Sequence, residues 1–480
     1  MITNQTYIYT TFSLYLLLIF GIGWYAWRQT RDLADYFLGG RRLGRWTTAI
    51  SAGASDMSGW LLLGLPGYAY IAGLKATWIA LGLLAGTWLN WRLVAPKLRI
   101  GSEACGNALT LPEYLENRFQ DKTHLLRILS AVFILFFFML YTSSGLVAGG
   151  KLFESVFGLS YSWAVIAGTV AILLYTTFGG FLAVSWTDLL QGLLMAFALV
   201  IAALLCLPAL GGLPGMIAEI NKVDPAMTDL FRTSDAGPLS WIAIVSLLGW
   251  GLGYFGQPHI LVRFMAIRSD KAIPDARKIA VTWTCLTLAA AIIVGCSSHG
   301  LLPGPLSEAD SEKVFIELVT LLFHPVPAGI CLAGILAAIM STADSQLLVS
   351  SSAFTKDLYQ LLFRKTPAQT ELVRVGRIAV VVISVAAAAL AMKPDRQVLD
   401  LVAYAWAGFG ATFGPVILLS LYWNRMTRDG AVAGMLAGGL TVIVWKQLED
   451  GIFELYELVP GFVISTIVIV IVNYLSRSRV

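Results

Sequence analysis

The sequence predicts an all-α, polytopic membrane protein in which two transmembrane segments are interrupted near their middle. Of its 480 residues, 57% are hydrophobic and only 13% are charged, whereas soluble domains carry about 25% charged residues. Apolar stretches long enough to cross a hydrocarbon core of about 30 Å recur along the whole chain. Two of them contain clusters of glycine and polar residues, at 51–60 and 249–258. Interrupted spans of this kind are typical of a solute and ion site at the membrane midplane.

About thirteen transmembrane helices are predicted from the apolar stretches. These cover residues 7–27, 46–66, 72–94, 127–149, 161–179, 188–208, 240–258, 276–302, 327–355, 374–392, 398–422, 430–446 and 454–475. No positive charge precedes Arg28, and the first stretch is too long for a signal-peptide core, so we expect it to be a retained span. Gly82 and Gly86 form a small-residue ridge of the kind that lets two helices pack closely.

The distribution of basic residues predicts the orientation. Most of the 33 lysines and arginines fall after spans 1, 3, 7, 9 and 11 and in the C-terminal tail, including the group that begins at Arg263. Cytoplasmic loops carry such an excess, so the N-terminus is expected outside and the C-terminus in the cytoplasm. The residues assigned to the outer side are Lys75, Lys151, Lys222, Arg232, Lys313, Lys393, Arg396 and Lys446.

The two interrupted spans are the second and the seventh, which predicts two five-helix halves. An odd number of spans in each half gives the halves opposite orientations, as in an inverted repeat with its site between them. The expected organisation is an extra N-terminal span and cytoplasmic loop at 1–45, a first repeat at 46–208, an extracytoplasmic loop at 209–239, a second, inverted repeat at 240–422, and two C-terminal spans with a short tail at 423–480.

The second span carries a carboxylate where the bilayer tolerates it poorly. Asp56 lies near the middle of this span, where an ionised side chain costs at least about 2.5–3.5 kcal/mol. Gly53, Ser55, Ser58 and Gly59 surround it. These small residues would let the helix unwind and turn backbone carbonyls towards a cavity.

The ninth span presents hydroxyl groups on one helical face. Residues at positions i, i+3, i+4 and i+7 share a face, and here they are Ala338, Ser341, Thr342 and Ser345. Such hydroxyls often bond back to the carbonyl four residues earlier, and this alternative stays open for Ser345. Together with carbonyls freed by the broken second span, hydroxyl oxygens suit a hard cation.

Other functional classes lack support in the sequence. The five cysteines are scattered singly, without a C-x-x-C motif or a Cys/His cluster, so neither a disulfide framework nor a zinc site is indicated. The net charge of +4 gives no indication of nucleic-acid binding. Because no nucleophile–base set is recognisable either, we expect a protein that is not an enzyme.

Three motifs carry a resemblance to a known family. They are DYFLGGR at 35–41, GLGYFGQPH at 251–259 and AIMSTADS at 338–345. With them, nearly the whole chain resembles the sodium:solute symporter family, in most detail its bacterial proline-transporting members. The resemblance implies a leucine-transporter-like fold of five plus five helices in inverted repeat, in the bacterial cytoplasmic (inner) membrane.

The same resemblance implies a sodium site. Its ligands would be the backbone carbonyls of Ala54, Met57 and Ala338 and the hydroxyls of Ser341 and Thr342. Sodium coupling would involve Asp56, Ser58, Gly59 and Asp188, the last near an inner exit or, as in some relatives, a second sodium site. The alternative for Asp188 is a first-turn acid of the sixth span. Asp344 occupies a position where some relatives have a serine, which leaves open whether more than one sodium ion binds.

The resemblance also implies the solute, L-proline, a zwitterion with a small apolar ring. The matching pocket residues are Tyr141, Trp250, Tyr254 and Pro258. Aromatic rings can enclose the proline ring and face its ammonium group, and free N–H groups at a half-helix N-terminus suit its carboxylate. The expected function is sodium-driven import by alternating access, with sodium as coupling ion and no other cofactor.

Two alternatives remain at this point. One is a symporter for another small organic solute, because a few pocket side chains decide the substrate. The other is a membrane-sensing module of a signalling protein. The short tail after the last span makes a soluble output domain unexpected.

Overall fold

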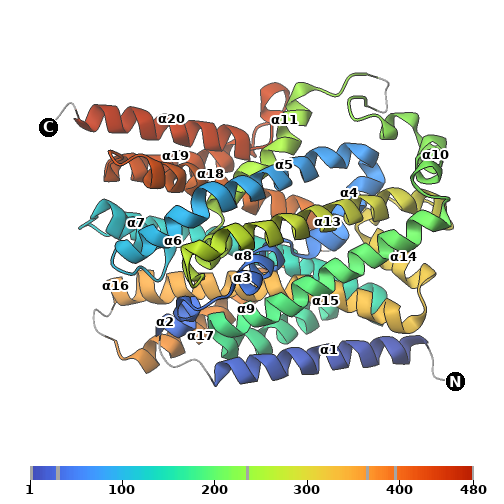
Figure 1. Ribbon diagram of the computed structural model, residues 1–480, viewed down its shortest axis with the longest axis horizontal. Helices are drawn as coiled ribbons and strands as arrows, with labels where there is room; N and C mark the ends of the chain where they lie inside the picture. The colour runs from blue at the N-terminus through green and yellow to red at the C-terminus, as the bar shows by residue number, and fades with distance from the viewer. Residues whose placement is uncertain (1–3, 29–32, 234–236, 364–366, 394–396, 478–480) are drawn as a thin grey trace.

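Long α-helices lie side by side in a computed structural model that describes residues 4–28, 33–233, 237–363, 367–393 and 397–477 (Figure 1). The helices of the first half are α1 (Asn4–Trp27), α2 (Leu33–Leu38), α3 (Arg45–Asp56), α4 (Leu65–Ala72), α5 (Thr77–Leu89), α6 (Ala95–Ala104), α7 (Leu111–Phe119), α8 (Leu125–Phe157), α9 (Tyr161–Ala209) and α10 (Leu213–Val223). Those of the second half are α11 (Trp241–Gly249), α12 (Pro258–Ala266), α13 (Ile273–Leu301), α14 (Val314–Leu322), α15 (Pro325–Ser352), α16 (Gln360–Leu362), α17 (Gln369–Ala391), α18 (Val398–Tyr422), α19 (Arg428–Trp445) and α20 (Leu458–Arg477). Within the described residues, β-structure is limited to two isolated bridges. The predicted all-α class is therefore confirmed.

Several helices continue through short π-helical or 3₁₀-helical turns. The π-helical turns are η2 (Trp60–Gly64), η4 (Asn90–Val94) and η9 (Ala353–Tyr359). The 3₁₀-helical segments relevant to the site are η6 (Trp250–Gly256) and η8 (Ser311–Lys313). Helix α9 is kinked at Gly180, whose φ of 64° is left-handed. The kink separates the two stretches predicted as the fifth and sixth spans.

Among the described residues, nine helical segments are long and apolar enough to cross a membrane. One of them, Trp60–Ala104, is 45 residues long and turns at Gly73, where φ is 65°. This segment therefore contains α4 before the turn and α5 with α6 after it, and nine segments do not equal nine crossings. The multi-pass architecture is confirmed, whereas the total of thirteen crossings stays a prediction.

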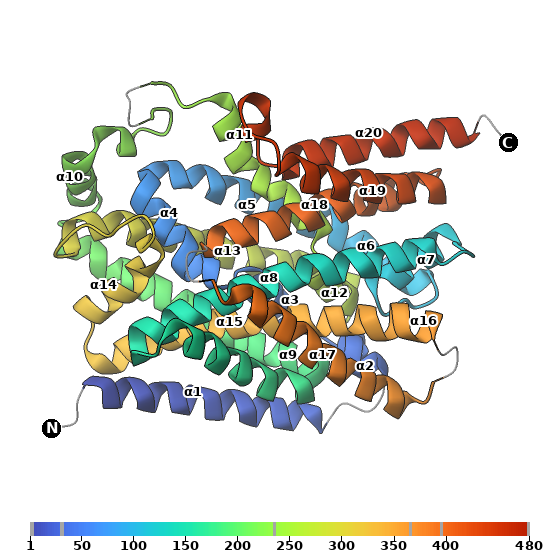
Figure 2. The same cartoon turned by 180° about the vertical axis from the view of Figure 1, so that it is seen from behind.

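The ends of the described chain lie at opposite ends of the bundle. Helix α1 runs along one side and α19 with α20 along the other, in both views (Figures 1 and 2). The short helices α10 and α14 lie at the end where α1 begins, and α7 and α16 lie at the end where α20 finishes. A chain that enters and leaves at opposite ends fits an odd number of crossings. Arg396, counted above as an outer charge, lies outside the described residues.

Both predicted interruptions are present in the structure. Helix α3 stops at Asp56, because the Ser58 N–H turns back to the Asp56 carbonyl at 3.0 Å instead of continuing the helical pattern. In the other span, α11 tightens into η6 and stops at Gln257, whose ψ of 108° is extended. Pro258 then begins α12, a position where its missing N–H costs no hydrogen bond.

Glycines bring α5 into backbone contact with the second interruption. A Cβ atom at Gly82 would lie 2.4 Å from the Leu248 carbonyl oxygen, and one at Gly86 would lie 2.3 Å from that of Gly251. Real Cβ atoms do not approach this closely, so only glycine permits the contact. The predicted small-residue ridge is confirmed, and it supports the broken segment from one side.

Gly86→Ala is therefore expected to destabilise the fold, by about 1–3 kcal/mol for an overpacked contact. The measurement is the thermal unfolding midpoint of the purified protein in detergent. Gly21→Ala is the matched control, since it also lies within a helix and a Cβ there meets nothing within 4 Å. Equal midpoints for the two variants would contradict the close packing of α5 on η6.

Candidate functional site

The carbonyl of Ala54 joins the end of α3 to α15. The Ser341 hydroxyl donates to this oxygen at 2.8 Å and the Thr342 hydroxyl at 3.2 Å. In an unbroken helix the Ser58 N–H would occupy the Ala54 carbonyl, but it bonds to Asp56 instead. The helix break thus leaves a last-turn carbonyl open to side chains from a distant helix.

Four of the five predicted sodium ligands meet at this point. The Ser341 hydroxyl also lies 3.2 Å from the carbonyl oxygen of Ala338, one turn earlier on α15. Ala54, Ala338, Ser341 and Thr342 are all buried. The fifth, Met57, directly follows α3, and its thioether packs towards α13, where Sδ lies 3.9 Å from the Thr287 hydroxyl oxygen. Neutral hydroxyl and carbonyl oxygens of this kind are the ligands that a hard cation prefers.

The Asp56 side chain contacts the second interruption. Its Oδ2 accepts a hydrogen bond from the Tyr254 hydroxyl at 2.7 Å, and its backbone carbonyl accepts one from the Tyr141 hydroxyl at 3.0 Å. Oδ1 has no hydrogen-bond partner in the part of the chain that the structure describes. Asp56 therefore connects the two broken spans to each other and to α8.

Ser58 and Gly59 lie in the break itself. Both are buried, and the Ser58 hydroxyl oxygen lies 3.5 Å from the backbone nitrogen of Trp60. A Cβ at Gly59 would lie 2.7 Å from that of Ala148 on α8. Gly59 thus lets α8 approach the break, which brings Tyr141 within reach of Asp56.

Two of the predicted substrate residues, Tyr141 and Tyr254, contact Asp56 through their hydroxyl groups, and Trp250 lies with Tyr254 on η6. Trp250 stacks on Tyr456 with ring centroids 5.4 Å apart, and Tyr254 meets Trp406 edge to face at 5.0 Å. Tyr141, Trp250 and Tyr254 are each at most 6% exposed. A carboxylate that is shielded from water and bonded to a tyrosine hydroxyl attracts a nearby cation strongly.

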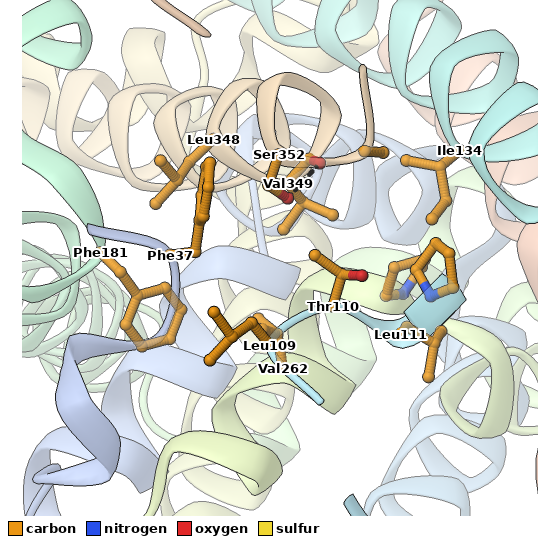
Figure 3. Close-up of a pocket in the computed structure, with 13 residues that line it drawn as sticks. Phe37, Leu109, Thr110, Leu111, Ile134, Phe181, Val262, Leu348, Val349 and Ser352 are labelled. Carbon is orange, nitrogen blue, oxygen red and sulfur yellow. Dashed lines mark hydrogen bonds between the residues drawn. The ribbon is translucent and has the colours of Figure 1, made fainter. Parts of the chain in front are cut away.

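Pro258 lines a small cavity together with residues of α2 and α7, and Figure 3 shows this cavity. The cavity there measures about 20 Å³, which is room for about one water molecule. Phe37 from α2 and Phe181 from α9 lie together on one side of it, and Ile134 and Leu111 lie on the other. These side chains and Pro258 leave little free space between them.

Asp188 takes part in a separate buried ion pair. It lies well inside α9, eight residues after the kink at Gly180, so the alternative of a first-turn acid is wrong. Its Oδ2 accepts hydrogen bonds from the Ser51 hydroxyl at 2.6 Å and from Arg263 at 3.0 Å. Arg263 also donates to Ser345. The Ser345 hydroxyl, whose partner was left open above, therefore bonds to this ion pair and is not part of the oxygen cluster at Ala54.

Three buried contacts near the site were not predicted from the sequence. Arg263, counted above with the cytoplasmic charges, is a buried partner of Asp188. Lys151, counted as an outer charge, forms a buried ion pair with Glu312 at 2.6 Å. Trp406 was read only as part of an apolar span. The sequence contained one sign that Arg263 is buried, because this cation lies inside an apolar stretch. No sequence pattern indicated a special role for Trp406.

Comparisons with known proteins identify the family of this chain. The model of the "Sodium:solute symporter family" matches residues 36–438. The chain is 52% identical over 474 residues to a sodium/proline symporter of Escherichia coli, covering 98% of this chain and 93% of that one. It is 48% identical to the high-affinity proline transporter PutP of Bacillus subtilis, covering 95% and 96%.

Solved structures give the fold. A sodium-coupled sialic acid symporter in a substrate-bound, outward-open state superposes with a TM-score of 0.79 at 20% identity, over 98% of both chains. MhsT in complex with L-phenylalanine superposes with a TM-score of 0.52 at 15% identity, over 91% of this chain and 99% of that one. The predicted leucine-transporter-like fold is confirmed. By its matched region and its identities, this chain belongs to the sodium:solute symporter family.

Proposed function

We propose that this chain is a symporter that uses a sodium gradient to import L-proline across the bacterial cytoplasmic membrane. Relatives about half identical over nearly their full length are sodium/proline symporters or proline transporters. The observation that carries the proposal is the end of α3. There, Ala54 offers an oxygen to α15 and Asp56 offers a carboxylate to Tyr254, so an ion site and an aromatic site share one short segment.

Sodium binds the oxygens of Ala54, Met57, Ala338, Ser341 and Thr342 in this proposal. The Ser341 and Thr342 hydroxyls now donate to Ala54. To bind a cation, both O–H bonds rotate away so that the lone pairs and the Ala54 carbonyl all face the ion. Sodium then bridges α3 and α15 more strongly than two neutral hydrogen bonds do. This draws the broken span against α15.

Proline binds among Tyr141, Trp250, Tyr254 and Pro258. Its ring packs against the aromatic side chains, and its ammonium group is attracted by their faces and by Asp56. Because Asp56 and Ala54 lie on the same turn, ordering by sodium also orders the proline site. The gain in affinity is reciprocal, since each ligand stabilises the arrangement that the other binds.

In this alternating-access transporter, the site lies between two inverted halves, 46–208 and 240–422. The N-terminus is outside and the C-terminus is in the cytoplasm. Support comes from the distribution of basic residues and from the opposite ends at which α1 begins and α20 finishes. On this orientation the cavity lined by Phe37, Phe181 and Pro258 lies on the cytoplasmic side of the proline site. Asp188 takes part in sodium coupling through its pair with Arg263, whose guanidinium group lies 5.2 Å from the centre of the Phe181 ring.

Uptake into proteoliposomes tests the proposed function. Labelled proline should accumulate with an inward sodium gradient and not with an equal potassium gradient, and unlabelled proline should compete better than other amino acids. Uptake driven by a pH gradient without sodium would contradict sodium coupling. A stronger competitor than proline would contradict the assigned substrate and favour another small organic solute.

Ser341→Ala and Thr342→Ala each remove one oxygen ligand from the cation. A ligand contact to a charge contributes about 1.5–3 kcal/mol, so half-saturating sodium should rise at least about tenfold. The measurement is sodium-dependent uptake at matched membrane abundance. Thr466→Ala on α20 is the control, since its hydroxyl bonds only within its own helix. Wild-type sodium dependence in both Ser341 and Thr342 variants would remove them from the site.

Asp56→Asn removes the negative charge of the side chain and keeps its ability to accept hydrogen bonds. The amide oxygen can still accept the Tyr254 hydrogen bond, so a much higher sodium requirement would be due to the lost charge. Asp56→Glu keeps the charge, and partial activity is expected despite crowding at a position that is 1% exposed. Sodium titrations of uptake compare the two variants. The reverse order, with Asn active and Glu inactive, would assign Asp56 a purely structural role.

Trp250→Ala should weaken the binding of proline more than that of sodium, because it removes a contact to the proline ring and no oxygen ligand of the cation. We expect half-saturating proline to rise about tenfold or more, with half-saturating sodium within about threefold of wild type, in line with the loss of about 1.5 kcal/mol or more of aromatic contact. Trp88→Ala is the control, since Trp88 is 45% exposed on the outside of α5. Unchanged proline affinity would place the solute elsewhere.

A further inference from the structure

Trp406 on α18 contacts the broken segment η6 in three ways. Its indole Nε1–H donates to the Trp250 carbonyl at 2.8 Å, and its ring meets that of Tyr254 edge to face. Its own carbonyl accepts a hydrogen bond from the Gln257 side chain at 3.1 Å. Trp406 is 1% exposed. One residue thus contacts the beginning, middle and end of the segment that carries the predicted proline residues.

The contact depends on a glycine in the segment. A Cβ at Gly253 would lie 1.9 Å from the indole nitrogen of Trp406. The indole therefore rests directly on the backbone of η6, where no other residue would fit. A ring held this closely fixes how far the segment can rotate about its own axis.

Side chains satisfy the carbonyl oxygens that the broken helix leaves open. Trp406 bonds to the Trp250 carbonyl, Gln257 to that of Gly253 at 3.2 Å, and Asn90 from η4 to that of Tyr254 at 2.9 Å. Open carbonyls are costly in a site shielded from water. The segment therefore has one favourable rotation, the one in which these three donors reach their acceptors.

We propose that Trp406 is a positioning residue that sets the direction of the Trp250 and Tyr254 rings and thereby the size of solute ring that the site accepts. This inference rests on the proposed function. Trp406 holds Trp250 through its backbone carbonyl and Tyr254 through its ring, so one indole on α18 contacts both residues and links their positions. Without the Nε1–H, the Trp250 carbonyl lacks its hydrogen-bond donor. We expect η6 to rotate in response, so that the distance between the Trp250 and Tyr254 rings is no longer fixed.

Trp406→Phe keeps an aromatic ring and removes the N–H donor. The assay measures inhibition of sodium-driven proline uptake by four-, five- and six-membered cyclic imino acids: azetidine-2-carboxylate, proline and pipecolate. In the variant, the preference for proline over pipecolate should fall at least about fivefold, and half-saturating proline should rise about tenfold. Half-saturating sodium should stay within about threefold of wild type. A merely structural defect lowers abundance and leaves the preference among ring sizes unchanged.

Gln257→Met provides a second variant, because it removes the donor to Gly253 and Trp406 at similar volume. It should relax ring-size preference in the same direction, and it carries the test if Trp406→Phe does not reach the membrane. Trp78→Phe is the matched control, since it loses an indole bond to a backbone carbonyl, that of Leu230, away from η6. Wild-type ring-size preference in Trp406→Phe, or in Gln257→Met in its place, would overturn the inference while leaving the proposed function intact. Absence of proline uptake by the wild type would overturn both.

Discussion

The end of α3 at Asp56 is the constraint on which the rest of the site depends. A membrane helix that stops in the middle of a bundle must find partners for its last carbonyls within the protein. Here the Ala54 carbonyl accepts hydrogen bonds from α15, and the Asp56 carbonyl accepts one from α8. The Asp56 side chain adds Tyr254 of the second break. Two residues of one helical turn thus contact three distant parts of the chain.

The second break is stabilised by different means. Helix α5 contacts it through Gly82 and Gly86, where backbone meets backbone. Trp406 holds it from α18, and Asn90 contributes a side-chain donor. The two breaks therefore differ in character. Hydroxyls and a carboxylate surround the first and can exchange partners for an ion, whereas close packing and indole contacts fix the second, which suits a wall for a solute ring.

The sequence predicted those parts of the site that depend on neighbours along the chain. Glycine and serine around Asp56 indicated the break, and helical spacing placed Ser341 and Thr342 on one face with Ala338. Contacts between distant segments were not predictable in this way. Arg263 looked like a loop charge because its partner, Asp188, lies on another helix. Trp406 lies in an apolar span where any large side chain would look equally suitable, and only the approach of Gly253 distinguishes it.

The central claim is that sodium joins the end of α3 to α15. Hydrogen exchange of the purified protein in lipid nanodiscs tests it most directly, with sodium compared against potassium at equal ionic strength. Sodium should slow backbone exchange in both 55–59 and 338–345, at the concentrations that support uptake. The C-terminal helix α20, which contributes no ligand, should be unaffected. Exchange that is the same in sodium and potassium in these two segments would contradict the account.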